Sequence, residues 1–258
     1  MTSAGGVPTD SAVPELDGAP LFLLDEVPDG DVLTVAGPEG RHAVDVLRIG
    51  PGERVRVGNG RGLVAEGTVL AAGPDGLRVQ VAARHEVPEP APTLVLVQAL
   101  PKGERGPLAV ELATELGVDR IVPWTASRCV TRWREDRVEK GLAKWRSAAR
   151  AASKQARRAR VPEVTGPMST RQVCGLLAEV DLALVLHEQA RRPLAGLAVP
   201  ASGTVAVIVG PEGGLTDGEV VAFRAAGAQA VRLGAEVLRT STAGAAALAA
   251  LSARTRWV

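Results

Sequence analysis

The chain has 258 residues, of which 46% are hydrophobic and 23% charged, as in a folded globular protein and unlike a disordered or fibrous one. No apolar stretch approaches the roughly 18–20 residues that a bilayer span needs, and residues 1–18 lack the basic start and apolar centre of a signal peptide, so we expect a cytoplasmic protein. Cys129 and Cys174 stand far apart and outside any paired ligand spacing, which argues against a disulfide and against a metal site.

The net charge of +1 is unevenly distributed along the chain. Residues 1–90 carry 7 Lys/Arg and 14 Asp/Glu, whereas residues 91–258 carry 23 and 15. Residues 128–160 alone hold 12 basic and 3 acidic side chains, and such a patch attracts a polyanion. The chain has no Tyr and only 2% aromatic residues, so we do not expect the base-stacking platforms of single-strand RNA binders.

The first part of the chain predicts a flexible tail and a small β-barrel. Residues 1–18 are small, polar and rich in Pro and Gly, which is typical of a flexible tail. Short apolar runs separated by Gly, Pro, Asp and Asn turns then indicate a barrel over residues 19–87, with one helical insert at 40–49. We expect its strands at 21–24, 32–35, 54–57, 63–70 and 77–82.

A linker and an α/β domain follow. The prolines at 88, 90 and 92 hold residues 88–92 extended, so we place the domain boundary there and the second domain at 93–258. The apolar run 93–100 predicts a buried parallel strand, and Gly117 ends the helix that follows at 104–116. Further strands are expected at 121–124, 182–187, 205–210 and 228–233, and a long helix at 136–159. This order predicts a mostly parallel sheet.

The long helix combines an apolar stripe with a basic face. At 100° per residue, the stripe comprises Val138, Leu142, Trp145, Ala149, Ala152 and Ala156. The opposite side carries Lys140, Lys144, Arg146, Arg150, Lys154, Arg157 and Arg158. Because no acid between residues 140 and 160 offsets these charges, we interpret the face as one that contacts nucleic-acid phosphates.

Three expected strands end in loops at 186–188, 210–215 and 233–243, and ligands of open α/β sheets bind beyond such carboxyl ends. Glycines in the second loop let a ligand lie against the main chain, and Thr216 and Glu219 have the spacing of a helix capping box. The chain contains neither a dinucleotide-binding glycine fingerprint nor a P-loop. A phosphate-free cofactor such as S-adenosylmethionine (AdoMet) therefore fits, and a nucleotide-dependent dehydrogenase does not.

The motifs Gly210-Pro211-Glu212-Gly213-Gly214-Leu215, Leu233-Gly234 and Leu238-Arg239-Thr240-Ser241-Thr242-Ala243 resemble the cofactor-site signature of the ribosomal RNA small-subunit uridine-N3 methyltransferase family, RsmE-type enzymes of the SPOUT superfamily. Upstream of these motifs, Lys102-Gly103-Glu104-Arg105 and Ser127-Arg128-Cys129 also match the family, in the family's order. In the first domain, His42 and residues 46–53 are similar to the family's PUA-like RNA-binding barrel. The likeness runs from Phe22 to the carboxyl end.

The resemblance implies a trefoil-knotted α/β SPOUT domain after a PUA-like barrel, a homodimer, and AdoMet-dependent methylation of uridine N3 in 16S rRNA of the small ribosomal subunit. It implies a cofactor pocket lined by Leu186, His187, Gly210, Glu212, Gly213, Leu233, Gly234, Leu238, Thr240 and Thr242. We expect RNA contacts from Arg41, His42, Arg48, Lys102, Arg128, Lys154, Arg157, Arg158 and Arg160, and no metal.

Uridine N3 must lose its proton before it can attack the sulfonium methyl. Arg239 is the candidate that stabilises the developing negative charge, and Glu212 or a water takes the proton. We interpret His187 as a hydrogen-bonded strand-end residue and not as a general base. Two alternatives stay open: another SPOUT RNA methyltransferase, for example one acting on ribose 2′-O of tRNA or rRNA, and a non-catalytic RNA-binding protein of ribosome assembly.

Overall fold

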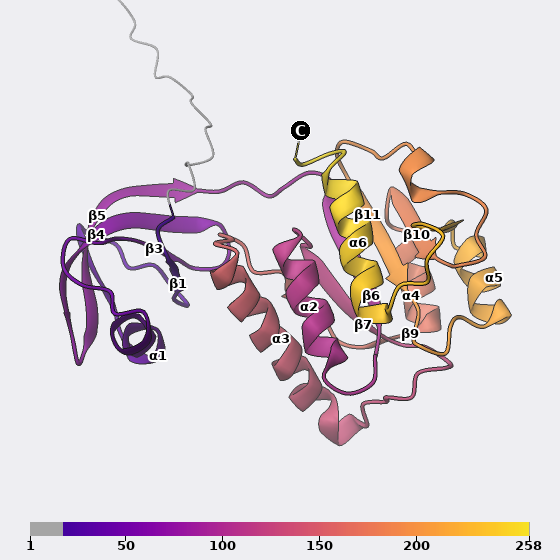
Figure 1. Ribbon diagram of the computed structural model, residues 1–258, viewed down its shortest axis with the longest axis horizontal. Helices are drawn as coiled ribbons and strands as arrows, with labels where there is room; N and C mark the ends of the chain where they lie inside the picture. Colours follow the sequence, from indigo (N-terminus) through magenta and orange to yellow (C-terminus); the bar gives the residue numbers. More distant parts are fainter. Residues whose placement is uncertain (1–17, 258) are drawn as a thin grey trace, which may run out of the picture. The chain divides into compact units, whose positions relative to one another are not determined.

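The computed structural model describes residues 18–257, which form two compact units (Figure 1). The first unit runs from the first described residue to Gly58 and from Leu63 to Val87, and the second comprises Asn59–Gly62 and the chain from Pro88 onward. The flexible tail predicted for residues 1–18 lies outside the described residues, apart from Gly18.

The first unit is built on a five-stranded sheet. Its strands are β1 (Leu21–Leu23), β2 (Val32–Val35), β3 (Arg54–Gly58), β4 (Leu63–Gly73) and β5 (Gly76–Glu86), in the order β1-β3-β4-β5-β2. β1 and β3 are parallel and the other pairs antiparallel. The order ends at β1 and β2, so the predicted barrel is open between these two strands. The expected helical insert is α1 (Gly37–Arg41), continued by the π-helical turn His42–Val46.

The first unit has its own hydrophobic core. Phe22, Leu33 and Leu77 are among its most deeply buried side chains. Irregular pairing between β4 and β5 bends the sheet around that core, and one of the two irregular positions lies at Gly67. A Cβ atom at Gly67 would overlap the carbonyl oxygen of Gln80, so only glycine fits at this bend.

The second unit contains a parallel sheet. Its strands are β6 (Thr93–Ala99), β7 (Arg120–Thr125), β8 (Glu163–Val164), β9 (Met168–Ser169), β10 (Leu182–Leu186), β11 (Thr204–Val209) and β12 (Gln229–Val231). The order is β12-β10-β11-β6-β7-β8, with β9 also paired to β7, and every pair is parallel. The predicted α/β class with a mostly parallel sheet is therefore confirmed, and the two-residue strands β8 and β9 were not predicted.

Helices cover this sheet. They are α2 (Arg105–Glu115), α3 (Val138–Gln155), α4 (Thr170–Leu177), α5 (Asp217–Ala225) and α6 (Thr240–Ser252), with short 3-10 turns at Glu135–Arg137 and Leu194–Gly196. α2 packs against both α3 and α6, and these three lie side by side in Figure 1. α6 also packs on the central strands β6 and β11. Among the described residues, no helix is long and apolar enough to span a membrane.

The long helix α3 confirms its predicted apolar stripe but is shorter than expected. Leu142, Trp145 and Ala149 are buried on the predicted face. The helix ends at Gln155, and Arg157 adopts a left-handed backbone conformation with φ of 55°, so the chain turns away beyond the helix. Arg157 and Arg158 consequently do not continue the helical face on which the sequence placed them.

Candidate functional site

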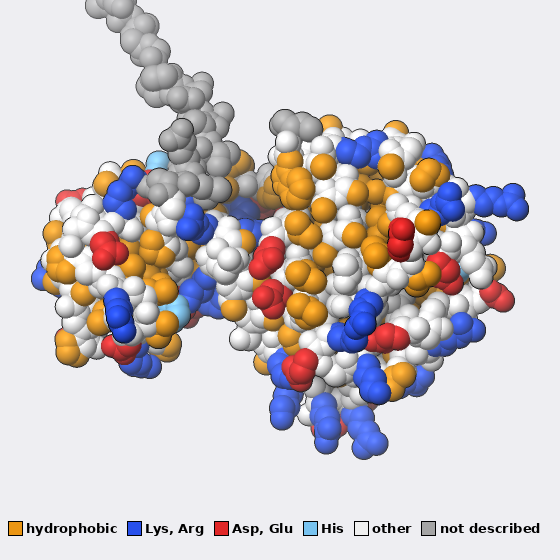
Figure 2. Space-filling model, viewed as in Figure 1, with side chains coloured by type: hydrophobic (Ala, Val, Ile, Leu, Met, Phe, Trp, Pro, Cys, Tyr) orange, Lys and Arg blue, Asp and Glu red, His pale blue; other side chains and the backbone are white. Residues whose placement is uncertain are grey.

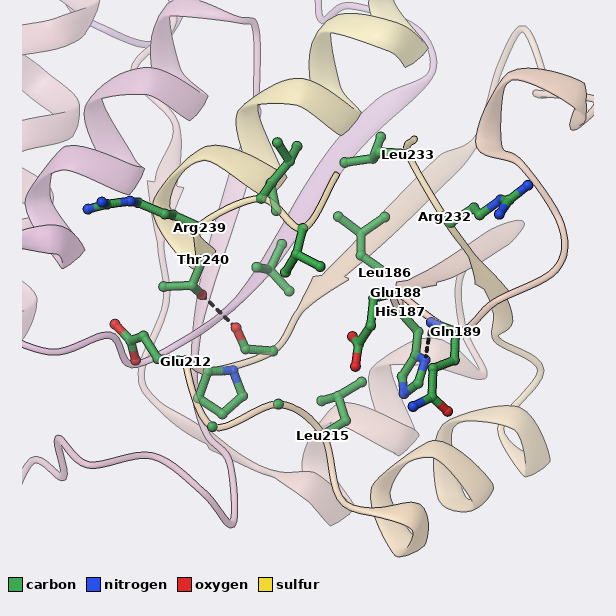
Figure 3. A pocket seen from close by; sticks show the side chains of 18 of the residues that line it. Leu186, His187, Glu188, Gln189, Glu212, Leu215, Arg232, Leu233, Arg239 and Thr240 are labelled. Atoms are coloured by element: carbon green, nitrogen blue, oxygen red, sulfur yellow. Dashed lines mark hydrogen bonds between the residues drawn. The ribbon is translucent and has the colours of Figure 1, made fainter. Parts of the chain in front are cut away.

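The carboxyl ends of three neighbouring strands bring the predicted loops together. β10 lies between β11 and β12, so the segments that follow these strands are adjacent in space. They enclose a cavity of about 660 Å³ (Figure 3). This volume is within the range of roughly 300–1,000 Å³ that is usual for small-molecule sites.

Most of the predicted cofactor residues line this cavity, as do both predicted catalytic residues, Glu212 and Arg239. The predicted cofactor residues found there are Leu186, His187, Gly210, Glu212, Gly213, Leu233, Gly234, Leu238 and Thr240. Thr242 is the exception: it is exposed in the first turn of α6 and does not line the cavity, which corrects its predicted placement. Thr240 and Thr242 are two residues apart, about 200° around the helix, so they lie on different sides of α6.

The glycine-rich loop forms one wall of the cavity. A Cβ atom at Gly210 would lie 3.0 Å from Leu215 Cδ2, and one at Gly213 would lie 3.1 Å from Arg128 Cβ. Arg128 holds the loop, because its Nη1 donates to the carbonyl oxygens of Gly213 at 3.1 Å and Leu215 at 3.2 Å. Arg128 was predicted to contact RNA. The structure shows its guanidinium group hydrogen-bonded to the loop while the residue is exposed, and its RNA contact stays a prediction.

The exit of the loop is fixed by the predicted capping box. Thr216 Oγ1 accepts from the backbone N–H of Glu219 at 3.2 Å, and Glu219 Oε2 accepts from the backbone N–H of Thr216 at 2.8 Å. Glu219 Oε1 also accepts from the backbone N–H of Ser127 at 2.8 Å. Burial raises the pKa of Glu219, but the hydrogen bonds from Ser127 and Thr216 outweigh it, so the pKa lies below its ordinary value.

A buried polar chain connects α6 to the same loop. Thr240 Oγ1 donates to the carbonyl oxygen of Gly210 at 2.5 Å (Figure 3). The same Oγ1 accepts from Gln98 Nε2 at 3.2 Å. Gln98 is 1% exposed and lies among apolar residues of β6. Sequence reasoning missed Gln98, although an amide within an apolar strand is itself a signal, because a buried polar group needs a partner.

Glu212 and Arg239 lie together on one side of the cavity. In Figure 3 their side chains extend away from Leu186 and Leu233. Glu212 Oε1 accepts from the backbone N–H of Lys102 at 3.1 Å, so this carboxylate ties the segment after β6 to the glycine-rich loop. Glu212 and Arg239 also border a smaller hollow of about 380 Å³.

His187 has the structural role that the sequence suggested. Its Nδ1 accepts from the backbone N–H of Gln189 at 3.2 Å (Figure 3). In the neutral imidazole the proton therefore lies on Nε2. This contact shapes the turn after β10, which supplies another wall of the cavity.

The basic surface near α3 differs from the predicted one. Lys144 pairs with Glu104 at 2.7 Å, and Arg160 lies 3.7 Å from Glu89, so acids from other segments offset charges that appeared uncompensated. Exposed cations instead gather where α3 begins, at the lower end of the second unit in Figure 2. They include Arg132, Arg134, Arg137 and Lys140.

Arg158 is a further correction. Its side chain is 15% exposed, and it donates to the carbonyl oxygen of Thr114 at 2.6 Å and pairs with Asp119 at 3.5 Å. Arg256 also pairs with Asp119. Burial lowers the pKa of Arg158 to about 10 despite the attraction of Asp119, so the residue is still charged at neutral pH. Arg158 therefore belongs to a largely buried ion cluster and not to an RNA surface.

In the first unit, the predicted RNA-contacting residues share the segment around the π-helical turn. Arg41 ends α1 and is exposed, and His42 is half-buried at the start of the turn. Arg48 follows the turn, exposed, with φ of 56°. Val46 is 65% exposed beside them. The segment thus presents cations together with an exposed aliphatic side chain.

The chain matches two known domain families. Residues 88–252 match the RNA methyltransferase domain, and residues 35–82 match the RNA methyltransferase PUA domain. A ribosomal RNA small subunit methyltransferase E from Mycobacterium bovis is 48% identical over 245 residues, which cover 93% of this chain and 94% of the relative.

Two solved structures resemble the chain over most of its length. Ribosomal RNA small subunit methyltransferase E from Neisseria gonorrhoeae, bound to S-adenosyl methionine, has a TM-score of 0.81 and 28% identity and covers 92% of this chain and 98% of its own. A putative methyltransferase from Legionella pneumophila with the bound cofactor SAM has a TM-score of 0.78 and 29% identity, with the same coverage of 92% and 98%.

Proposed function

The chain belongs to the RNA methyltransferase family that includes ribosomal RNA small subunit methyltransferase E, and from this premise we propose that it methylates N3 of a uridine in 16S rRNA. It is an AdoMet-dependent enzyme. The observation that carries the proposal is the convergence of three strand-end loops on one cavity, with Arg239 and Glu212 at its edge.

The cavity suits AdoMet. Leucines at positions 186, 215 and 233 offer apolar surface for an adenine, and the glycines at 210, 213 and 214 let the loop main chain form a cavity wall without side chains of its own. Among the described residues, no cluster of His, Cys, Asp and Glu could hold a metal ion. When bound, AdoMet supplies an electrophilic methyl group.

Two residues of the protein stabilise the negative charge on the uridine and accept its proton. We assign to Arg239 the stabilisation of the negative charge that develops on the uracil when N3 loses its proton. Glu212 or a water takes that proton. The loop contacts of Arg128 and Thr240 hold the cavity wall in place, and this wall would keep a bound AdoMet and the uridine at fixed positions.

We assign RNA binding to cations outside the cavity. In the first unit these are Arg41 and Arg48, with His42 as a hydrogen-bonding neighbour, and in the second Lys102, Lys154, Arg157 and Arg160. The partner is the small ribosomal subunit, and we place the reaction in the cytoplasm. The trefoil knot implied by the resemblance belongs to this proposal.

We also propose a homodimer. Val237 lines the cofactor cavity yet is 78% exposed, and Val130 lines the smaller hollow yet is 73% exposed. A second copy that covers these side chains would complete the site. Analytical ultracentrifugation should give twice the chain mass of 26.6 kDa, and a monomer at micromolar concentration would contradict the assignment.

Methyl transfer to purified small subunits from a strain lacking this gene tests the proposed activity. Nucleosides released from the product should include N3-methyluridine. A 2′-O-methylated nucleoside instead would favour the other SPOUT chemistry. Absence of both, together with absence of AdoMet binding, would favour a ribosome-assembly protein.

A further inference from the structure

The smaller hollow shares its border with the cofactor cavity. It is lined by Lys102, Arg105, Val130, Glu212 and Arg239. Arg105, Glu212 and Arg239 also line the larger cavity, so a molecule in one hollow would touch the same side chains as a molecule in the other. Arg105 has no role in the cofactor site described above.

The smaller hollow carries an excess of positive charge. Three cationic side chains face a single carboxylate, that of Glu212. The nearest other acid in the sequence, Glu104, is drawn to α3, where both of its carboxylate oxygens accept from Lys144 Nζ at 2.7 and 2.8 Å. Glu104 therefore neutralises a lysine of α3 and leaves the charge of the hollow in place.

The cofactor does not account for this charge. The sulfonium group of AdoMet is itself a cation, and its one carboxylate carries a single negative charge against the three basic side chains. A ligand with a second negative charge is needed. A phosphodiester supplies it, and the planar fork of an arginine matches two phosphate oxygens at once.

We propose that the smaller hollow is the subsite for the acceptor nucleotide, in which Arg105 and Lys102 bind a phosphate flanking the target uridine. Arg239, on the border of both hollows, then faces the uracil. Val130 offers an aliphatic surface to the ribose or base. This assignment rests on the proposed function and adds to it a phosphate-binding role for Arg105.

Two separate binding contacts to one nucleotide would fix its orientation. A phosphate held by Arg105 and a base held near Arg239 restrict both the position and the rotation of the uridine. Arg105 is thus a positioning residue, and its loss should affect the use of RNA and not the binding of AdoMet.

The test compares Arg105→Ala, Arg105→Lys and wild type on small subunits that lack the methyl mark, over a series of salt concentrations. Arg105→Ala should lower kcat/KM about tenfold or more, as for a lost hydrogen-bonded charge. One lost phosphate contact should also make the slope of log affinity against log salt shallower by about 0.7 to 0.9. Arg105→Lys should keep the slope, because it keeps the charge.

The matched control is Arg171→Ala, an exposed arginine on α4 that lines neither hollow, and it should change nothing. An unchanged salt slope for Arg105→Ala overturns the inference, and so does a loss that lies wholly in the AdoMet dissociation constant. A wild-type protein that binds AdoMet but does not methylate these subunits would instead overturn the proposed function.

Discussion

The catalytic role that we propose for Arg239 rests on its position between two hollows. It lies at the start of α6 and borders both the cofactor cavity and the smaller hollow. Arg239→Ala should lower kcat about 10²- to 10³-fold, the cost of removing one group that stabilises transition-state charge. The dissociation constant of AdoMet, measured by calorimetry, should change little. A variant that turns over at the wild-type rate would remove Arg239 from the mechanism.

Glu212 has two roles that substitution can separate. Its Oε1 accepts from the backbone N–H of Lys102, and a glutamine can keep that contact but cannot take a proton. Glu212→Gln should therefore bind AdoMet like wild type, whereas Glu212→Ala should bind it more weakly. If Glu212 is the proton acceptor, kcat falls equally in both variants. Equal loss of AdoMet affinity in both would contradict the loop-tying role.

Thr240 offers a matched pair within one helical turn. Thr240→Val keeps the shape of the side chain but leaves the Gly210 carbonyl and the Gln98 amide without this partner, at a cost of about 1–3 kcal/mol. We expect a lower melting temperature and weaker AdoMet binding. Thr242→Val, exposed on the same helix, is the control and should behave like wild type. Identical behaviour of the two variants would refute the buried chain.

At the scale of residues, the glycine-rich loop could be predicted, because its glycines and the capping box after it depend only on residues that are close together in the sequence. Gln98 is a visible polar residue in an apolar strand, but its hydrogen bond could not be predicted, since its partner Thr240 is distant in the chain and is reached only through the fold. Arg158 was misplaced for the same reason, because Asp119 and Thr114 come from other segments.

At the scale of elements, the cap of α5 yields a pH-dependent prediction. Glu219→Ala removes the acceptor of the Ser127 and Thr216 backbone N–H groups, and should lower the free energy of unfolding by about 1–3 kcal/mol at pH 7. The pKa of Glu219 is lowered in the folded state, so its contribution is complete above its ordinary value of 4.5 and is lost as the pH falls through the folded-state pKa.

The melting temperatures of wild type and Glu219→Ala, measured by circular dichroism, should therefore differ at pH 7 and converge below pH 4.5. A difference that stays constant as the pH falls to 3 would show that the charge of Glu219 does not contribute. Glu139→Ala is a control, because this glutamate is exposed and pairs only with Arg146 in the described contacts.

The long helix shows where element-level reasoning succeeds and where it stops. Periodicity predicted the buried face of α3, because burial of an amphipathic helix depends on its own spacing. Charge compensation depends on neighbours, and the acids Glu104 and Glu89 come from outside the helix. Helix α4 was missed although Ser169 and Gln172 have capping-box spacing, because its eight residues are fewer than the roughly 11–18 over which helical periodicity is recognised.

At the scale of the whole molecule, the alternation of strands and helices was enough to predict the α/β class, and the proline run indicated a boundary near residue 88. The order of the parallel strands was beyond sequence reasoning, because parallel pairing joins segments far apart in the chain. That order places β10 between β11 and β12 and so creates the cavity. The RNA-binding role of the first unit stays a prediction.

Primer extension on 16S rRNA tests the central claim most directly, because a methyl group on uridine N3 blocks the pairing edge and halts reverse transcriptase. RNA from a strain lacking the gene should show no stop at one uridine where wild-type RNA shows one, and the wild-type gene should restore it while Arg239→Ala should not. A stop that persists without the gene, or that Arg239→Ala restores in full, would contradict the account.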